Sequence, residues 1–440
     1  MTDVLARTGL TEAQRLEASI AARTAIVAIV GQGYVGLPLA MAVASAGFRT
    51  IGFDPARAYT LNAGLSHIPD VSGDELSQLI AEGGYQASAE EWPLKIADVI
   101  VVCVPTPLHG DTPDLSCIRS AGEAIAEHVR PGILVVLEST TYPGTTEEVL
   151  LPLIASADRV LGDTLFLAFS PERIDPGNQQ FGLKNTPKVV GGADAVSGDL
   201  AGAFYATFVD QIVRVPGTRE AEMAKLIENT FRHVNIALMN ELAVFCGRAG
   251  IDVHAAIRAA ASKPFGYMPF FPGPGVGGHC IPVDPNYLAW QFRQAGERFR
   301  LVETAEEINS HMPHYVARRI QDLLNEIGVP LRGARILVVG AAYKPNINDW
   351  RESPCVPLVE LLSQAHAEVV IIDPHVAALP TREGTFETVT LMEALSQPID
   401  LAVIVTPHDG IDYQAIIDHA PIVYDTRAFL SGEEANVYTL

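Results

Sequence analysis

The chain has 440 residues, a formal net charge of −22 and the composition of a soluble globular protein. We expect two or three domains, because a single hydrophobic core rarely grows to this size. The acidic charge argues against a nucleic acid or an anionic membrane as partner. The five cysteines are widely spread without a CxxC spacing, which is typical of reduced thiols in a cytoplasm and argues against zinc or disulfides.

Residues 1–23 form an N-terminal extension without the basic region and apolar run of a secretory signal. Leu10, Leu16 and Ile20 are spaced to line one side of a short helix packed on the body. The apolar runs further along are too short to cross a bilayer, which takes about 20 helical residues. We therefore expect a soluble, cytoplasmic protein.

Residues 24–30 (TAIVAIV) are a continuous apolar run, as expected of a strand buried on both faces. The turn GQGYVG follows, then an apolar helical segment, then a second strand ending in Asp54. Gly31, Gly33 and Gly36 permit a tight turn and the close approach of a pyrophosphate to a helix N-terminus. A carboxylate after the second strand can bind a ribose 2'-hydroxyl and repels a 2'-phosphate, so the pattern predicts NAD rather than NADP.

Three more apolar runs lead into loops rich in Pro, Thr, Ser and Glu, within residues 97–108, 133–146 and 164–178. Loops at the carboxyl ends of parallel strands carry ligand contacts, which makes Thr106, Thr140 and Glu172 candidates for the site. An ordinary turn or cap is an equal alternative for each of them.

Residues 218–249 contain no proline and predict one helix of unusual length. Lys225, Asn229 and Arg232 fall on one face of this helix. Such a polar stripe is either a solvated face or, on so apolar a helix, the lining of a cleft or a subunit contact.

The stretch 272–288 reads PGPGVGGHCIPVDPNYL. Gly277 lacks a Cβ and would let a substrate approach the backbone closely, just ahead of His279 and Cys280. Asp284 follows four residues after the thiol. The stretch indicates a nucleophilic cysteine with a carboxylate nearby, although a small buried cysteine in a Gly-Pro turn fits the same letters.

A second α/β unit follows a further helical region at 300–327. Strands are predicted for ARILVVG, AEVVIID, DLAVIVTP and PIVYD. The end of the chain, SGEEANVYTL, reads as a polar tail without evident chemistry. Two strand-rich units thus flank a helical centre.

Taken together, these motifs resemble those of the UDP-glucose/GDP-mannose dehydrogenase family. The resemblance covers nearly everything after residue 23 and rests, in the family's order, on GQGYVGLP, VPTPL, EST, SPERIDPGN, AEMAKLIENTFRHVNIALMNE, KPFGYMPFFPGPGVGGHCIPVDPNYL and AAYKPNINDWRESP. SPERIDPGN and PGPGVGGHCIP look like the forms of bacterial UDP-N-acetylglucosamine 6-dehydrogenases, which serve surface polysaccharides such as lipopolysaccharide.

The resemblance implies an α/β fold of two Rossmann-like doubly wound domains joined by a long central helix, which also forms the core of a homodimer or higher homo-oligomer. The expected domains are the extension 1–23, an NAD-binding domain 24–215, a central helical region with the cysteine loop 216–328, and a UDP-sugar-binding domain 329–440. The implied reaction is NAD-dependent oxidation of the C6 alcohol of UDP-N-acetylglucosamine to the carboxylate.

The resemblance also assigns residues, and no metal. The catalytic set is Cys280 as nucleophile, Lys225, Asn229 and Asp284 around the reacting oxygen and water, and Glu172 and Thr140 for acid–base steps. The cofactor set is Gly31, Gly33, Tyr34, Val35, Gly36, Asp54, Arg57, Thr106, Thr140 and Arg351. The substrate set is Glu172, Arg173, Lys225, Asn229, Arg232, Gly277 and Lys344.

The chemistry suits these residues. A nicotinamide accepts one hydride at a time, so an aldehyde must be held between two oxidations, and the thiolate of Cys280 can hold it as a thiohemiacetal and then a thioester. Lys225 or His279 would activate the thiol. Lys225 and Asn229, one helical turn apart, can both donate to the charge that develops on the substrate oxygen.

Three alternatives stay open. The substrate could be UDP-N-acetylmannosamine or UDP-glucose, because pocket contacts read the stereochemistry at C2. A two-electron dehydrogenase of the hydroxyacid type would share the NAD-binding turn and have no use for Cys280. A non-catalytic NAD-binding or scaffold protein would need neither the nucleophile nor the proton-handling residues.

Overall fold

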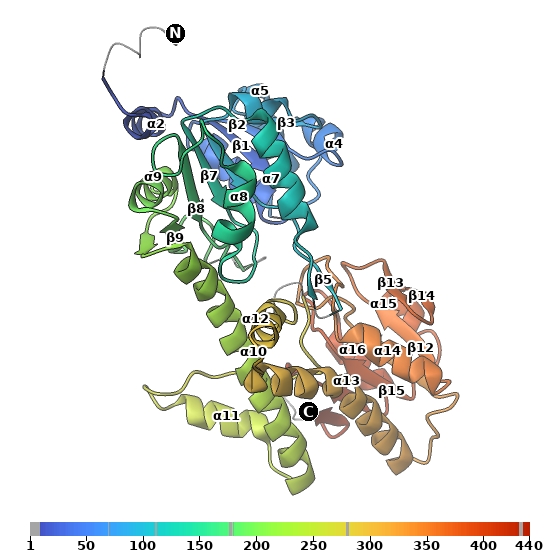
Figure 1. Cartoon of the computed structure of the whole chain (residues 1–440). Coiled ribbons are helices and arrows are strands. Elements are labelled where there is room, and N and C mark those ends of the chain that lie inside the picture. Colours follow the sequence, from blue (N-terminus) through green and yellow to red (C-terminus); the bar gives the residue numbers. More distant parts are fainter. Residues whose placement is uncertain are drawn as a thin grey trace. The chain divides into compact units, whose positions relative to one another are not determined.

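The computed structural model describes residues 9–68, 70–110, 112–175, 178, 180–278, 281–430 and 434–440. The chain divides into two compact units, Met1–Glu228 and Asn229–Leu440, and the division falls inside the long helix α10 (Thr218–Ala249). Each unit is built on a largely parallel sheet with helices packed on it (Figure 1). The predicted α/β class is confirmed. Within the described ranges, no helix is long and apolar enough to span a membrane.

The sheet of the first unit has the strand order β10-β9-β8-β7-β4-β1-β2-β3. From β3 to β8 all neighbours are parallel, in the order typical of dinucleotide-binding folds. At the far edge, β9 pairs antiparallel with β8 and parallel with β10. The strands are β1 (Ile26–Val30), β2 (Arg49–Phe53), β3 (Tyr85–Ser88), β4 (Val99–Val102), β7 (Ile133–Leu137), β8 (Leu165–Phe169), β9 (Lys188–Gly192) and β10 (Ile212–Val215).

Helices cover both faces of this sheet. They are α2 (Glu12–Ala21), α3 (Gly36–Ser45), α4 (Ala58–Asn62), α5 (Gly73–Ala81), α6 (Trp92–Ile96), α7 (Ser116–His128), the π-helical turn η1 (Thr146–Leu150), α8 (Leu151–Ile154) and α9 (Ala195–Tyr205). A short hairpin, β5 (Leu108–His109) and β6 (Thr112–Pro113), leaves the sheet after β4.

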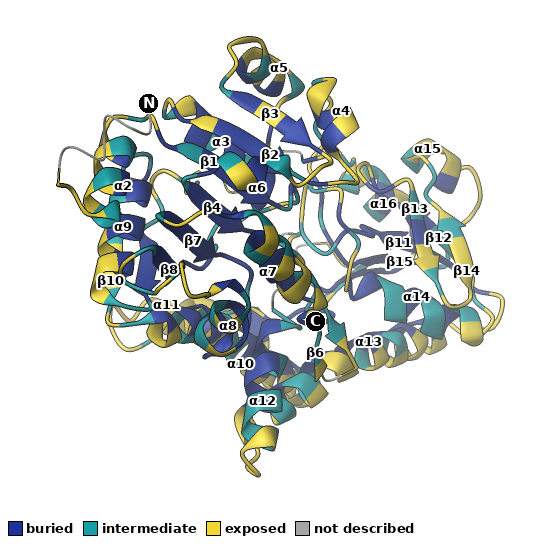
Figure 2. Ribbon diagram, turned by 45° about the horizontal axis from the view of Figure 1, so that its top comes forward, coloured by how far each residue is buried: buried dark blue, intermediate teal, exposed yellow. Residues whose placement is uncertain are grey.

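The core of the first unit lies on the two faces of the sheet. Val27 and Ile29 of β1 pack with α3 and α9, whereas Ala28 and Val30 pack with α7 and α8. Figure 2 shows the central strands as buried throughout, while the helices over them expose their outer faces. Residues 27–30 therefore fill both faces of the sheet, as the lack of alternation in the run 24–30 predicts.

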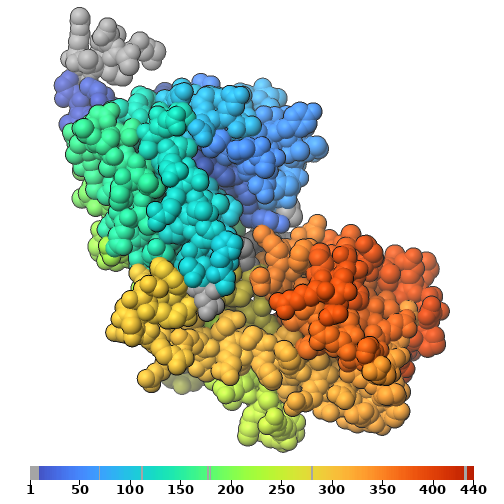
Figure 3. Space-filling model, turned by 45° about the vertical axis from the view of Figure 1, so that its right-hand side comes forward, coloured from blue at the N-terminus to red at the C-terminus, as the bar shows by residue number. Residues whose placement is uncertain are grey.

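The N-terminal helix α2 packs against α9 (Figure 3) and buries Leu16 and Ile20 in the core. The prediction for Leu10 is wrong, since its side chain is 38% exposed. The reason is the helix start: Thr11 is the N-cap, its hydroxyl accepts from Gln14 N at 3.2 Å, and Gln14 closes a capping box. Leu10 therefore precedes the helix.

The sheet of the second unit has the order β12-β11-β15-β16-β17, with every neighbouring pair parallel. This is the other common doubly wound order. Ile336 and Val338 of β11 face one core, and Leu337 and Val339 face the other. The strands are β11 (Arg335–Val339), β12 (Glu368–Ile372), β15 (Leu401–Ile404), β16 (Val423–Asp425) and β17 (Val437–Thr439).

The remaining elements of the second unit are mostly helical. They are α11 (Val253–Ala261), α12 (Asp284–Gln294), α13 (Arg300–Glu326), α14 (Cys355–Gln364), α15 (Leu391–Ala394) and α16 (Tyr413–His419), with the hairpin β13 (Ala378–Thr381) and β14 (Gly384–Glu387). The helices predicted at 218–249 and 300–327 are both present.

The end of the chain corrects the sequence interpretation. It is not merely a polar tail, because Val437 pairs with Val423 and β17 adds a fifth strand to the sheet. Leu440 packs into the core of the unit. A strand of three residues shows too little alternation for its pattern to be recognised.

Candidate active site

The three glycines of the turn between β1 and α3 differ in why the position needs a glycine. Gly31 has a φ of +89°, and a Cβ on it would lie 2.6 Å from the carbonyl oxygen of Cys103. A Cβ on Gly36 would lie 1.8 Å from the carbonyl oxygen of Gly31. A Cβ on Gly33 would meet no protein atom within 4 Å. The fold itself thus requires the first and third glycines, while the second leaves open space at the start of α3.

Asp54 lies directly after β2 and is buried, with an exposed fraction of 6%. Its Oδ2 accepts from the backbone N–H of Gln32 at 3.0 Å and from Nη1 of Arg57 at 3.0 Å. Its Oδ1 accepts from the N–H groups of Ala56 and Arg57, at 3.0 and 3.1 Å. The carboxylate therefore fixes the glycine turn to the end of β2.

Gln32, between the first two glycines, has a role that the sequence analysis missed. Its side chain is fully buried, its Nε2 donates to the carbonyl oxygens of Ile29 and Gly31, and its Oε1 accepts from the hydroxyl of Tyr85 at 2.8 Å. A Cβ on Gly52 would lie 2.5 Å from the Gln32 side chain. The Gln32 side chain thus links the glycine turn to β1 and β3. In the sequence, only its position inside the glycine motif indicates such a role.

These features fit a dinucleotide. Gly33 and the N-terminus of α3 would hold the pyrophosphate, because the space there is open and the first N–H groups of a helix attract anions. Asp54 would hold a ribose hydroxyl. Tyr34 and Val35 lie between Gly33 and the start of α3 in the chain, and their contacts with the cofactor stay predictions.

The loop after β7 carries Thr140, whose carbonyl oxygen accepts from the Thr106 hydroxyl at 2.7 Å. The two predicted cofactor residues are therefore in contact. Glu222 of α10 holds the next part of this loop, since its carboxylate accepts from Gly144 N at 2.6 Å and from the N–H and hydroxyl of Thr146 at 2.9 and 2.7 Å. Burial raises the pKa of Glu222 to about 7.

Glu172 follows β8 and lies beside Lys225 of α10, whose Nζ donates to the Glu172 carbonyl oxygen at 2.6 Å. The Glu172 carboxylate points elsewhere: Oε1 accepts from Arg173 N at 2.6 Å, and Oε2 faces Nζ of Lys188 at 3.2 Å. Arg173 forms an ion pair with Glu228 at 2.7 Å. The structure thus brings together three predicted residues, Glu172, Arg173 and Lys225, within the first unit.

The polar stripe of α10 is not uniform. Lys225 is buried, Asn229 is half-buried and Arg232 is exposed. A solvated face does not describe Lys225, because its ammonium has a protein acceptor. Arg232 does match a solvated position in the isolated chain.

In the second unit, Asn229 donates through Nδ2 to Oδ2 of Asp284, the first residue of α12, and Asp284 is buried. Two predicted catalytic residues are therefore in contact. A Cβ on Gly277 would lie 2.7 Å from the carbonyl oxygen of Glu352 and 2.8 Å from Cβ of Tyr343. Tight packing within the unit thus explains Gly277 without any substrate.

Cys280, the predicted nucleophile, and His279 lie outside the described residues. Arg351 forms a two-pronged ion pair with Asp349, at 2.9 and 2.6 Å. Lys344 lies in the turn after β11, near the carboxyl ends of the strands. The functional roles of all these residues stay predictions.

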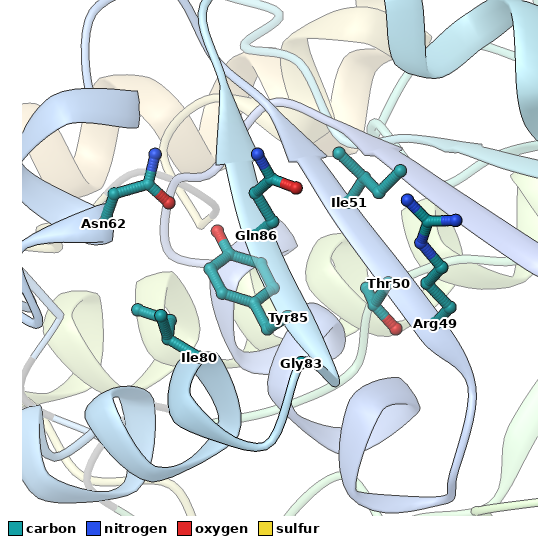
Figure 4. Close-up of a pocket in the computed structure, with 8 residues that line it drawn as sticks. All are labelled: Arg49, Thr50, Ile51, Asn62, Ile80, Gly83, Tyr85 and Gln86. Carbon is teal, nitrogen blue, oxygen red and sulfur yellow. The ribbon is translucent and has the colours of Figure 1, made fainter.

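A pocket of about 370 Å³ lies on β2 and β3, lined also by Asn62, Ile80 and Gly83 (Figure 4). Arg49 begins β2 and Gly83 precedes β3, so part of its wall is at the amino ends of these strands. The glycine turn lies at the opposite, carboxyl ends. None of the predicted site residues lines this pocket.

Comparison with known proteins covers almost the whole chain. The NAD binding domain of the UDP-glucose/GDP-mannose dehydrogenase family matches residues 25–209, its central domain 219–311 and its UDP binding domain 337–432. The UDP-N-acetyl-D-mannosamine dehydrogenase of Pyrococcus horikoshii is 36% identical over 87% of this chain and 89% of the relative. The Escherichia coli K12 protein of the same name is 34% identical over 90% of this chain and 98% of that relative.

A solved structure of a Pyrococcus horikoshii UDP-D-ManNAc dehydrogenase covers 94% of this chain and 98% of its own, with a TM-score of 0.84 and 33% identity. The predicted family, the NAD cofactor and the two Rossmann-like domains are confirmed. The chain belongs to the UDP-glucose/GDP-mannose dehydrogenase family and is an NAD-dependent oxidoreductase of UDP-sugars.

Proposed function

We propose that the chain oxidises the C6 alcohol of UDP-N-acetyl-D-mannosamine to the carboxylate. The observation that carries this proposal is the set of relatives named UDP-N-acetyl-D-mannosamine dehydrogenases, which match at 34 to 36% identity over nearly the full length. The sequence motifs favour the N-acetylglucosamine epimer, and the relatives support the alternative, UDP-N-acetylmannosamine, better. The two sugars differ only at C2, and the motifs that point to chemistry at C6 carry no information about that carbon.

The proposed roles follow the sequence prediction. Cys280 adds to the C6 aldehyde, the resulting thiohemiacetal loses a second hydride to become a thioester, and water releases the acid and the thiol. NAD is the hydride acceptor in both oxidations. Lys225 and Asn229 donate to the oxygen on which charge develops, while Asp284, Glu172 and Thr140 handle protons and water. The contact Lys225–Glu172 supports the part of this set that lies in the first unit, and the contact Asn229–Asp284 supports the part that lies in the second.

Initial rates with UDP-N-acetylmannosamine, UDP-N-acetylglucosamine and UDP-glucose test the substrate. We expect kcat/KM to be highest for the mannosamine sugar by at least about tenfold, because the wrong epimer leaves polar groups of the pocket unpaired. A higher value for either of the other sugars would replace the proposed substrate and keep the C6 chemistry.

We also propose a homodimer formed through α10. Phe231, Leu238, Leu242 and Phe245 recur along this helix at helical spacing and are 48%, 48%, 41% and 62% exposed. A twofold axis would pair the stripe with its own copy and bury it. Light scattering of the wild type and of Phe245→Glu tests this. We expect the wild type to be a dimer and Phe245→Glu to be a monomer, and a monomeric wild type contradicts the proposal. The domain boundaries and the cytoplasmic location stay predictions.

A further inference from the structure

A buried ionic cluster lies beneath the Glu172 loop of the first unit. Nζ of Lys188, the first residue of β9, is 3.1 Å from Oε2 of Glu138 and 3.2 Å from Oε2 of Glu172. The hydroxyl of Tyr205 donates to Oε1 of Glu138. The four side chains come from the ends of β7, β8 and α9 and the start of β9, so distant parts of the chain converge on one ammonium.

The side chains of the cluster are almost inaccessible to solvent. The side chains of Glu138, Lys188 and Glu172 are 0%, 3% and 12% exposed. A charge buried to this extent is tolerated only when it is paired, and removing one partner of such a pair is strongly destabilising. Burial alone would lower the pKa of Lys188, but the two carboxylates outweigh it and raise the pKa above the ordinary value. Lys188 therefore carries its positive charge at neutral pH.

Glu172 is the member of the cluster that contacts Lys225, one of the predicted catalytic residues. Its backbone oxygen accepts from Lys225, while its Oε1 accepts from the N–H groups of Arg173 and Ile174. Burial alone would raise the pKa of Glu172, yet Lys188, the Ile174 N–H and Lys225 outweigh it and lower the pKa. The carboxylate is thus held in one orientation and in its ionised form.

We propose that Lys188 is a positioning residue of the dehydrogenase, which holds the Glu172 carboxylate in place and ionised for its proton transfers, and that Glu138 anchors Lys188 for this purpose. The inference deepens the proposed function and rests on it, because it needs Glu172 to act during turnover. We assign Lys188 no contact with the substrate, because its side chain is 3% exposed and its ammonium faces Glu172 and Glu138.

The surrounding groups leave Lys188 as the dominant cation. Tyr205 and Cys103 also face the cluster, and burial raises the pKa of both, so they stay neutral near neutral pH. Lys225 of α10 is a second cation acting on Glu172. It comes after Lys188 and the Ile174 N–H in its effect on the carboxylate, and its own ammonium is engaged by the Glu172 carbonyl.

The test is the pH profile of kcat for Lys188→Met, measured by NADH formation with whichever UDP-sugar the wild type turns over fastest. Without the ammonium the pKa of Glu172 rises, so the acid limb moves to higher pH by about one to three units, the effect of one close opposite charge on a carboxyl. Lys184→Met removes an exposed cation four residues earlier and leaves the limb in place. An unmoved limb in Lys188→Met overturns the proposal.

Two further variants protect the test against loss of the fold. Glu138→Gln together with Lys188→Met leaves one buried carboxylate instead of two, and its acid limb should also move up; if this variant keeps the wild-type limb, Lys188 does not set the ionisation of Glu172. Glu138→Gln alone keeps the cation beside Glu172 and predicts no upward shift. The substrate proposal fails separately, because it concerns which sugar the wild type prefers and not the position of the limb.

Discussion

Replacing Gly33 and Gly36 by alanine separates the binding of NAD from the stability of the fold. At Gly33 the added methyl meets no protein atom within 4 Å, and the backbone is not in the left-handed region. At Gly36 the methyl would lie 1.8 Å from the Gly31 carbonyl oxygen, far inside an ordinary contact of 3.4 to 4 Å. The same chemical change therefore meets open space in one case and backbone in the other.

The two positions give opposite expectations. Gly33→Ala should leave the free energy of unfolding unchanged or raise it by about 0.4–1 kcal/mol, since alanine restricts the unfolded chain. Its methyl would occupy the approach of the pyrophosphate, so we expect the Kd for NAD to rise at least about tenfold, which is about 1.4 kcal/mol. Gly36→Ala should lose about 1–3 kcal/mol of stability or more, because the turn or the helix start must shift.

Urea unfolding without NAD gives the stabilities, and calorimetric titration gives the Kd for NAD. If Gly33→Ala binds NAD as the wild type does, the pyrophosphate does not lie against Gly33 and the assignment of the turn is wrong. If Gly36→Ala is as stable as the wild type, the close contact with Gly31 does not constrain the fold as described.

Three other changes have defined outcomes. Burial raises the pKa of Glu222 from 4.5 to about 7, so the native state holds the proton more tightly than the unfolded state. The free energy of unfolding should therefore fall by at most about 3 kcal/mol as the pH rises from the lower to the higher of these values. Glu222→Gln should abolish that fall, measured by urea titrations at about pH 5 and 7.5. Cys280→Ala should abolish formation of the acid, measured by mass spectrometry of the product, and undiminished acid would remove the nucleophile assignment. Asp54→Ala should raise the KM for NAD by at least about tenfold and reduce the preference over NADP, because the carboxylate that accepts from Gln32 and Arg57 is lost; an unchanged preference would contradict its ribose role.

Local patterns made much of the first unit predictable. The run 24–30, the glycine turn and Asp54 are neighbours in sequence as well as in space, so strand, turn and carboxylate could be inferred together. The long helix 218–249 was predictable because the segment contains no proline. Thr11 and Gln14 form a capping box that could have excluded Leu10 from the N-terminal helix.

Contacts between distant residues were beyond the sequence. Lys188 and Glu138 are fifty positions apart in the sequence. They meet because β9 runs antiparallel to β8, which brings the start of β9 to the carboxyl ends of β7 and β8. Nothing in the local letters distinguishes this lysine from an exposed one such as Lys184. The same holds for Glu222, whose partners lie 76 to 78 positions earlier. Strand order and register decide such pairs, and neither is written in a local pattern.

The central claim is a four-electron oxidation of UDP-N-acetyl-D-mannosamine in which the aldehyde stays bound between two steps. Its most direct test is to count the NADH formed, by absorbance, when a limiting amount of this sugar is fully consumed in excess NAD. We expect about two NADH per sugar, because the thiol retains the aldehyde until the second hydride leaves. One NADH per sugar, with free aldehyde in solution, would contradict the account.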